Sequence, residues 1–280
     1  MTTLDEVVAG AVGGHRAPGA VVAVAAPGQA PTVVAVNGDP DAVYDIGSVT
    51  KVMTATLVLQ HVARGDLGLD DPVADRVPEF RLDPPEATRA VTVRHLLSHT
   101  SGIDRADGFA DTGEGDDAVA RYVAECVAGA PLLHPPGERW SYCNAGFTVL
   151  GRLVEVLDGR PWDDALADGI FAPAGMTATT IARLDPGRRV STGHRYDPDL
   201  GEIVVETRRM PRSVGPAGNV LATAGDLIAF AEALTGGSGV LLDPDLAAEM
   251  LVLQAEMRNG HQGLGWAVTA PGMAAHGGST

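Results

Sequence analysis

The sequence predicts an α/β (α+β) protein in which a discontinuous α/β domain carries a helical insertion. Short strand-like runs lie near both ends of the chain, and mostly helical patterns fill the stretch from Asp66 to about Arg183. Strands separated in this way share one sheet only if the chain returns to it after the helices. We therefore expect residues 1–65 and 205–280 to form one domain and residues 66–204 to form a second, mostly helical one.

The N-terminal part supplies the first strands and a buried helix. Residues 3–13 have the spacing of a short amphipathic helix. Ala20–Ala26 and Thr32–Val36 are valine-rich runs separated by a segment with two prolines and a glycine, which predicts a hairpin. Thr50–Arg64 is apolar on nearly every side, as in a buried helix, and Gly65 stands at its C-cap position.

Capping residues and apolar periodicity predict the remaining elements. A stripe of Phe147, Leu150, Val154 and Leu157 marks the face of one of these helices that we expect to be buried. The expected helices are Thr92–Leu97 with Thr92 as cap, Asp116 to about Ala128, Asn144–Leu157, one opened by Pro161 as a first-turn proline, Ala224–Leu234 and Pro244–Leu253, and the expected strands are Leu264–Thr269 and Ala274 to the end.

Composition excludes several classes of protein. The 280 residues are 45% hydrophobic and 20% charged, which is ordinary for a globular protein, and the net charge of −16 argues against nucleic acid or an anionic membrane as partner. The two cysteines, Cys126 and Cys143, form no disulfide or metal-binding pattern. No leader with a basic and an apolar region and no membrane-spanning stretch is visible, so we expect a cytoplasmic protein, although a chain with its leader removed would look the same.

Lys51 is the only lysine in the chain, and the other nineteen basic residues are arginines. It follows Ser48 by three residues at the start of the expected buried helix, so both side chains share one helical face. Arginine keeps its proton near neutral pH, whereas a buried lysine can lose one. Ser-x-x-Lys is the spacing of a serine nucleophile activated by an amine. The motif alone is weak, and one lysine left by chance in an arginine-rich chain is the alternative.

A second cluster, Tyr142-Cys143-Asn144, precedes a predicted helix. Beside an ammonium, a tyrosine phenolate is stabilised and can shuttle protons. The alternative for Tyr142 is an aromatic residue that packs at a helix start.

A third cluster, His276-Gly277-Gly278-Ser279, lies on the last predicted strand. Two glycines in a strand allow a second backbone to approach closely, as a substrate along a sheet edge would. The alternative is a flexible terminus.

These three clusters in this order resemble the serine β-lactamase and penicillin-binding protein superfamily, in particular its class C-type group of D,D-peptidases, D-aminopeptidases and carboxylesterases. The resemblance covers nearly the whole chain. Further segments that match the family are Leu96–Gly102, Pro136–Phe147, Gly151–Pro161, Phe171–Met176, Pro216–Asn219, Ala224–Leu227 and Gly263–Trp266. The resemblance implies a β-lactamase/transpeptidase-like fold, with an antiparallel sheet flanked by helices beside a mostly helical domain.

The resemblance also implies roles for the clusters. Ser48 would be the acylated nucleophile, and Lys51 with Tyr142 would form the base and proton relay. Asn144 would bind the substrate amide or hold Lys51. The third cluster would bind substrate through His276, Gly277, Gly278 and Ser279, with His276 in place of the lysine of Lys-Thr-Gly and the N–H of Ser279 joining that of Ser48 in an oxyanion hole.

The chain departs from the family at its C-terminal end. The family continues after the third motif with two further strands and a terminal helix, whereas this sequence stops at Thr280. In the family's sheet order, those strands lie between the motif strand and the N-terminal hairpin. We therefore expect a fragment, or a domain completed by a missing C-terminal segment or a second chain.

Other kinds of site find less support. His95 and His99 are four residues apart, but the glutamate of His-Glu-x-x-His and a third ligand are missing. Asp104–Asp117 lacks the alternating ligands of a calcium loop. No complete Gly-x-Ser-x-Gly and no phosphate-binding glycine motif occurs, so we expect neither a metal nor another cofactor.

The sequence therefore predicts a serine hydrolase that forms an acyl-enzyme with a small-molecule or short-peptide ester or amide. Carboxylesterase and D-residue-specific peptidase are the leading possibilities, and a β-lactam is a third substrate class. An acyltransferase or peptide cyclase on the same scaffold remains an alternative, since only the acyl acceptor would change. A non-catalytic fragment or ligand-binding relative is the second alternative.

Overall fold

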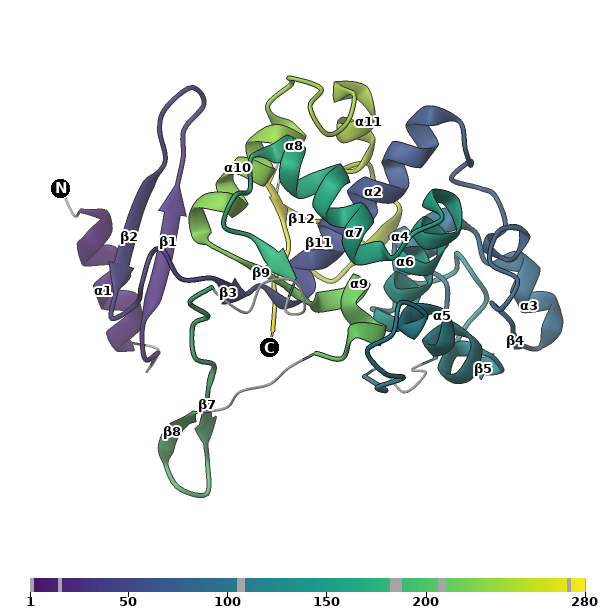
Figure 1. Cartoon of the computed structure of the whole chain (residues 1–280), viewed down its shortest axis with the longest axis horizontal. Coiled ribbons are helices and arrows are strands. Elements are labelled where there is room, and N and C mark those ends of the chain that lie inside the picture. Colours follow the sequence, from purple (N-terminus) through teal and green to yellow (C-terminus); the bar gives the residue numbers. More distant parts are fainter. Residues whose placement is uncertain are drawn as a thin grey trace.

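Two long helices, α2 (Thr50–Arg64) and α6 (Asn144–Asp158), pack against each other at the centre of the protein (Figure 1). The computed structural model describes residues 3–14, 17–104, 109–181, 188–205, 210–270 and 273–279. Three predicted features therefore cannot be compared in full. The predicted end of the helical region near Arg183, the predicted end of the last strand at Thr280 and residues 105–108 of the acidic loop lie outside the described residues.

The other helices surround this pair or follow it along the chain. They are α1 (Leu4–Gly14), α3 (Pro85–Ala90), α4 (Val93–Leu97), α5 (Ala118–Tyr122), α7 (Trp162–Leu166), α8 (Ala172–Ala174), α9 (Gly215–Gly218), α10 (Ala224–Thr235) and α11 (Pro244–Glu249). Two π-helical turns, Val123–Val127 and Ala167–Phe171, extend α5 and α7. Short 3₁₀ turns lie at Gly47–Val49, Val73–Asp75 and Arg212–Val214.

The described strands form small sheets that are antiparallel except for one parallel pair, β4–β5. The pairings are β1 (Ala20–Val24) with β2 (Thr32–Val36); β3 (Tyr44–Asp45), β9 (Val220–Ala222) and β6 (Thr180–Ile181); β4 (Leu82–Asp83) with β5 (Ala130–Pro131); β7 (His194–Asp197) with β8 (Glu202–Val205); and β10 (Ala255–Met257), β11 (Gly260–Gln262), β12 (Ala267–Ala270) and β13 (Met273–Ala275). In Figure 1 the chain after β12 runs down to the C-terminal end, which lies close to β3 and β9.

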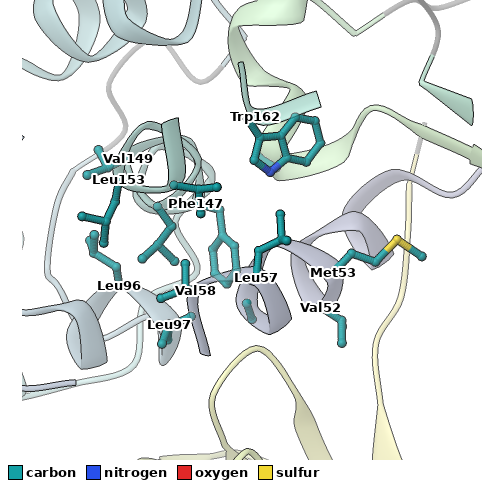
Figure 2. Packing of buried hydrophobic residues seen from close by; sticks show 14 of the residues in the cluster. Val52, Met53, Leu57, Val58, Leu96, Leu97, Phe147, Val149, Leu153 and Trp162 are labelled. Atoms are coloured by element: carbon teal, nitrogen blue, oxygen red, sulfur yellow. The ribbon is translucent and has the colours of Figure 1, made fainter. Parts of the chain in front are cut away.

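The main hydrophobic core lies between α2, α4, α6 and α7. Burial of large aliphatic and aromatic side chains is the main favourable term in folding. Figure 2 shows labelled core side chains from these helices: Val52, Met53, Leu57, Val58, Leu96, Leu97, Phe147, Val149, Leu153 and Trp162. The same packing fixes the N-terminal ends of α2 and α6 relative to each other.

Many predicted element boundaries are confirmed. The N-terminal helix and the hairpin lie where the sequence places them. Gly65 and Gly159 end α2 and α6 in the left-handed conformation, with φ of 77° and 67°. Thr92 caps α4 in a capping box with His95.

Several predicted boundaries are wrong. Pro161 is the N-cap of α7 and not its first-turn residue, and α11 ends at Glu249 instead of Leu253. The strand predicted from Leu264 begins at Ala267 because Gly265 adopts a positive φ of 80°. The last strand ends at Ala275, so the third motif follows the strand and does not lie on it.

The β7–β8 hairpin, β10 and β11 were not predicted. The hairpin extends away from the rest of the molecule in Figure 1. The division into domains at residues 65 and 205 stays a prediction.

Candidate active site

Ser48 lies in the 3₁₀ turn that joins β3 to α2. Gly47, the first residue of this turn, has a φ of 48°, and its N–H donates to Asp45 Oδ1 over 2.9 Å. The N–H of Ile46 donates to the carbonyl of Val220 in β9. These contacts fix the turn, and they place Ser48 at the N-terminal end of the buried helix, where backbone N–H groups lack helical partners.

Lys51 lies one turn further along α2 and is completely buried. Its Nζ is 3.0 Å from Ser48 Oγ and donates a second hydrogen bond to the carbonyl of Ala217 in α9. Burial lowers the pKa of Lys51 to about 7, because an ammonium loses its hydration there. A substantial fraction of the protein therefore has a neutral amine beside the serine near neutral pH.

Tyr142 lies beside the same pair. Its hydroxyl forms a hydrogen bond with Ser48, and Lys51 Nζ is 5.0 Å from the centre of its ring. Burial raises the pKa of Tyr142, although the hydrogen bond with Ser48 lowers it in part. Burial therefore disfavours the phenolate that we expected beside the ammonium, and the place of Tyr142 in the proton relay stays a prediction. Tyr142 keeps its proton near neutral pH and Lys51 is the better base.

The third motif reaches the same place through its backbone. A Cβ added to Gly278 would lie 2.1 Å from the carbonyl oxygen of Ile46, and one added to Gly47 would lie 2.9 Å from the nitrogen of Ser279. The chain after β13 therefore runs directly against the turn that contains Ser48. Such close approach requires glycine at both positions.

The two glycines of this motif differ. Gly277 faces open space, whereas Gly278 is held against the protein's own backbone. The close backbone approach predicted for these glycines is found at Gly278, where the second backbone is that of Ile46. Contact of Gly277 or Gly278 with a substrate stays a prediction.

His276 is half-buried, and its Nδ1 lies 2.8 Å from the carbonyl oxygen of Gly277. Burial, with a smaller effect of the nearby Lys51 ammonium, lowers the pKa of His276 to about 4, although the hydrogen bond with the Gly277 carbonyl raises it in part. His276 is therefore neutral at pH 7. It cannot replace the positive charge of a lysine at this position, so any contact with substrate is a hydrogen bond.

Asn144 is the first residue of α6 and is half-buried. Its carbonyl accepts a hydrogen bond from the Thr148 hydroxyl. The preceding residue, Cys143, caps the helix through Sγ, which accepts from the N–H of Gly146. The predicted contact of Asn144 with a substrate amide or with Lys51 stays a prediction.

Two groups near the site were not predicted from the sequence. Ala217 O accepts from Lys51, and a backbone acceptor has no side-chain signal. His99 stacks on Tyr142, with ring centres 4.4 Å apart. From the sequence, His99 was weighed as a metal ligand and found to lack partners, although its place in a segment that matches the family could have drawn attention to it.

The described residues contain no group of three or more His, Cys, Asp or Glu side chains that could hold a metal ion. His95 and His99 make separate hydrogen bonds, in which each Nδ1 accepts from a backbone N–H, of Thr92 and Cys143 respectively. Among the helices that the structure describes, none is long and apolar enough to cross a membrane.

Comparison with known protein families shows which family the chain belongs to. The family model described as Beta-lactamase matches residues 4–280. The chain belongs to the beta-lactamase family. The resemblance drawn from the sequence and the mixed α/β fold implied by it are thereby confirmed.

Two similar proteins give the family assignment a context. The chain is 43% identical over 234 residues to penicillin-binding protein 4 of Amycolatopsis lactamdurans, which covers 78% of this chain and 59% of that protein. It is 34% identical over 172 residues to esterase EstB of Burkholderia gladioli, which covers 57% of this chain and 43% of the esterase. The chain thus spans about two fifths to three fifths of the length of these relatives.

A solved structure extends the likeness to the fold. The D-stereospecific amidohydrolase from Streptomyces sp. superposes with a TM-score of 0.75 at 29% identity, covering 94% of this chain and 83% of that one.

Proposed function

We propose that this protein is a serine hydrolase that cleaves an ester or amide through an acyl-enzyme on Ser48. The observation that carries the proposal is the Ser48–Lys51 pair, with 3.0 Å between Oγ and Nζ and a lysine pKa of about 7. A base with a pKa near the working pH combines sufficient neutral form with sufficient basicity.

In the first step, the neutral amine of Lys51 accepts the hydroxyl proton of Ser48 while Oγ forms a bond to the substrate carbonyl carbon. The carbonyl π electrons move to oxygen and give a tetrahedral oxyanion. The N–H groups of Ser48 and Ser279 are the proposed donors to this oxygen. Their support is the position of Ser48 at the start of α2 and the close approach of Ser279 to Gly47.

The tetrahedral intermediate then collapses. The oxyanion reforms the carbonyl, the bond to the leaving oxygen or nitrogen breaks, and that atom receives the proton that Lys51 holds. The Tyr142 hydroxyl, hydrogen-bonded to Ser48 and protonated near pH 7, passes a proton from Lys51 to the leaving group. Water attacks the acyl-enzyme in the same way, with Lys51 again as base, and releases the acid and free Ser48.

The names of the relatives support the substrate class. One relative is an esterase, one is a penicillin-binding protein and one is a D-stereospecific amidohydrolase. We infer that this chain acts on small esters or on amides of D-amino acids, which share a carbonyl group and differ in leaving group. Ser48 is half-buried and Tyr142 is 40% exposed, so the site is in contact with solvent, and we infer that its substrate is a small molecule or short peptide.

A labelling experiment tests the nucleophile. The protein is incubated with a fluorophosphonate, and the adduct is mapped by mass spectrometry. We expect the adduct on Ser48, and we expect Ser48→Ala to lose both labelling and p-nitrophenyl ester hydrolysis. Ser191→Ala, a serine of the loop before β7, is the matched control and should retain both. An adduct on a different serine, with Ser48→Ala still active, contradicts the proposal.

A substrate panel tests the substrate class. Esters, amides of D- and L-amino acids, and β-lactams are compared by kcat/KM. We expect hydrolysis of esters or D-amides, and a preference for L-amides would contradict the inferred class.

A further inference from the structure

We propose that His99 is a positioning residue that holds the Tyr142 hydroxyl at Ser48 by fixing the chain on both sides of Tyr142 and stacking on its ring. The proposal rests on the proposed function, since it assigns a role within the same site. His99 lies just after α4 and is 44 residues away from Cys143 in the sequence.

Three contacts of His99 surround Tyr142. The carbonyl of His99 accepts from the N–H of Ser141 over 2.7 Å, and its Nδ1 accepts from the N–H of Cys143 over 3.1 Å. The ring stacks on that of Tyr142, with 4.4 Å between ring centres and 27° between planes. One residue thus fixes the backbone before Tyr142, the backbone after it and the side chain itself.

The backbone of His99 is adapted to this arrangement. Its φ is 55°, in the left-handed region that few residues other than glycine adopt. Among the described residues, Asn37 is the other non-glycine residue with a positive φ. An uncommon conformation persists where surrounding contacts determine it. Here it lets the carbonyl and the ring of one residue meet the same segment.

The imidazole is neutral and fixed. His99 is fully buried, which holds its pKa well below the usual value, and the nearby ammonium of Lys51 also lowers it. Because Nδ1 accepts a hydrogen bond, the proton of the neutral ring is on Nε2. The ring also contacts Phe147, with 5.0 Å between centres, and Phe147 is fully buried in the main core. His99 therefore links Tyr142 to the core without adding a charge beside Lys51.

Tyr142 needs such support because it precedes α6 in a segment without regular structure and is 40% exposed. A second anchor lies at Trp140, whose Nε1 donates to Oε1 of the buried Gln262. The contacts of His99 act directly on both neighbours of Tyr142. Displacement of a catalytic group by about 1 Å can cost on the order of 10²-fold in rate.

Two substitutions of His99 separate the effect of its ring stacking from the effect of its Nδ1 hydrogen bond. His99→Asn tolerates the positive φ and keeps an acceptor near Nδ1, but it removes the stacked ring. His99→Phe keeps a ring and removes the acceptor, which leaves the Cys143 N–H without its partner. We expect kcat to fall by about 10- to 100-fold in both variants, with a smaller change in KM. His95→Asn is the control, because His95 also accepts from a backbone N–H but contacts neither Ser141 nor Cys143 in that way.

A double-mutant cycle with Tyr142→Phe distinguishes positioning from general loss of structure. If His99 acts through the Tyr142 hydroxyl, His99→Asn should lower kcat in the wild-type background and have little further effect in the Tyr142→Phe background. An equal loss of kcat in both backgrounds would overturn the proposal.

An NMR measurement gives a readout that does not depend on activity. With ring-labelled tyrosine, the Tyr142 signal is assigned by its absence in Tyr142→Phe. We expect the neighbouring imidazole to shift this signal in the wild type, and we expect His99→Asn to move and broaden it. An unchanged signal overturns the positioning role. If Tyr142→Phe is fully active while the signal still depends on His99, the proposed chemistry of Tyr142 fails and the positioning by His99 stands.

Discussion

The two sides of Ser48 are built in opposite ways. On one side, Lys51 and His99 are buried side chains whose protonation is set by loss of water. On the other side, the segment from Gly277 to Ser279 is exposed, and it contacts the turn that contains Ser48 through its backbone. The buried side is specified by side-chain chemistry, whereas the exposed side depends on the absence of side chains at Gly47 and Gly278.

This difference separates the tasks that we propose for each side. Proton transfer needs a group whose pKa is shifted far from its usual value, which requires burial. Stabilisation of an oxyanion needs N–H groups at a fixed place, which close backbone contact supplies without a charge. Mutations on the buried side should therefore change the pH dependence of kcat/KM. Mutations on the exposed side should lower kcat and leave that pH dependence unchanged.

The largest effect is expected for Lys51→Arg. Arginine keeps the charge but cannot accept the Ser48 proton, so kcat should fall by about 10²–10⁴-fold, as far as in Lys51→Met. Steady-state kinetics of both variants checks this. An arginine variant with most of the wild-type rate would show that Lys51 acts only through its charge.

Gly278→Ala should have the next largest effect. Its Cβ would collide with the carbonyl of Ile46 and move Ser279 away from Ser48, at a cost of about 10²–10³ in kcat if an oxyanion donor is displaced. Gly277→Ala is the matched variant, because its Cβ would meet open space, and its loss of kcat should be much smaller. Equal losses would show that the contact with Ile46 is unimportant.

The pH dependence of kcat/KM should reflect the buried side. Below pH 7, Lys51 becomes protonated and cannot act as base, so kcat/KM should fall by about tenfold per pH unit. His276 stays neutral until about pH 4 and does not contribute to this limb. We therefore expect the His276→Gln variant to show the same decrease of kcat/KM below pH 7 as the wild type. If the decrease is lost in this variant, the group that titrates near pH 7 is His276 and not Lys51.

The smallest effect concerns stability. The pKa of Lys51 is about 7 in the folded state and 10.5 as its ordinary value, so the unfolded state binds more protons between these values. The stability of the wild type should thus rise with pH from 7 to 10.5, and the cost of burying the ammonium is complete below pH 7. Lys51→Met should be more stable than the wild type by about 1–4 kcal/mol below pH 7, with a gain that shrinks as the pH rises. Urea unfolding at several pH values checks this, and a constant difference would contradict it.

Sequence reasoning predicted the buried side better than the exposed side. The single lysine after Ser48 and the apolar helix around it indicate a buried amine directly. In the structure, Lys51 Nζ lies within hydrogen-bond distance of Ser48 Oγ. The glycines of the third motif indicate a close approach but not its partner. The partner is Ile46, a backbone contact that depends on tertiary packing and has no local signal.

The same limit applies to the fold. Helices with caps and apolar stripes, such as α2 and α6, were predicted to within one or two residues because local contacts determine them. Short strands such as β3, β6 and β9 carry two or three residues each and exist only through pairing with one another. Likewise, the direction of the Tyr142 pKa shift follows from burial, which the sequence does not give.

The N-terminal helix and hairpin form a separate layer, visible at one side of Figure 1, with a consequence for local unfolding. Their buried residues, Val8, Val12 and Val34, make a cluster apart from the main core. This small cluster, even with the partly buried side chains around it, cannot offset the conformational entropy of the whole segment, so its stability depends on contact of β1 with α10. Amide protons of α1, β1 and β2 should therefore exchange with solvent through openings that leave α2 and α6 folded. Proteolysis of the native protein should begin in this layer and leave the Ser48–Lys51 helix intact.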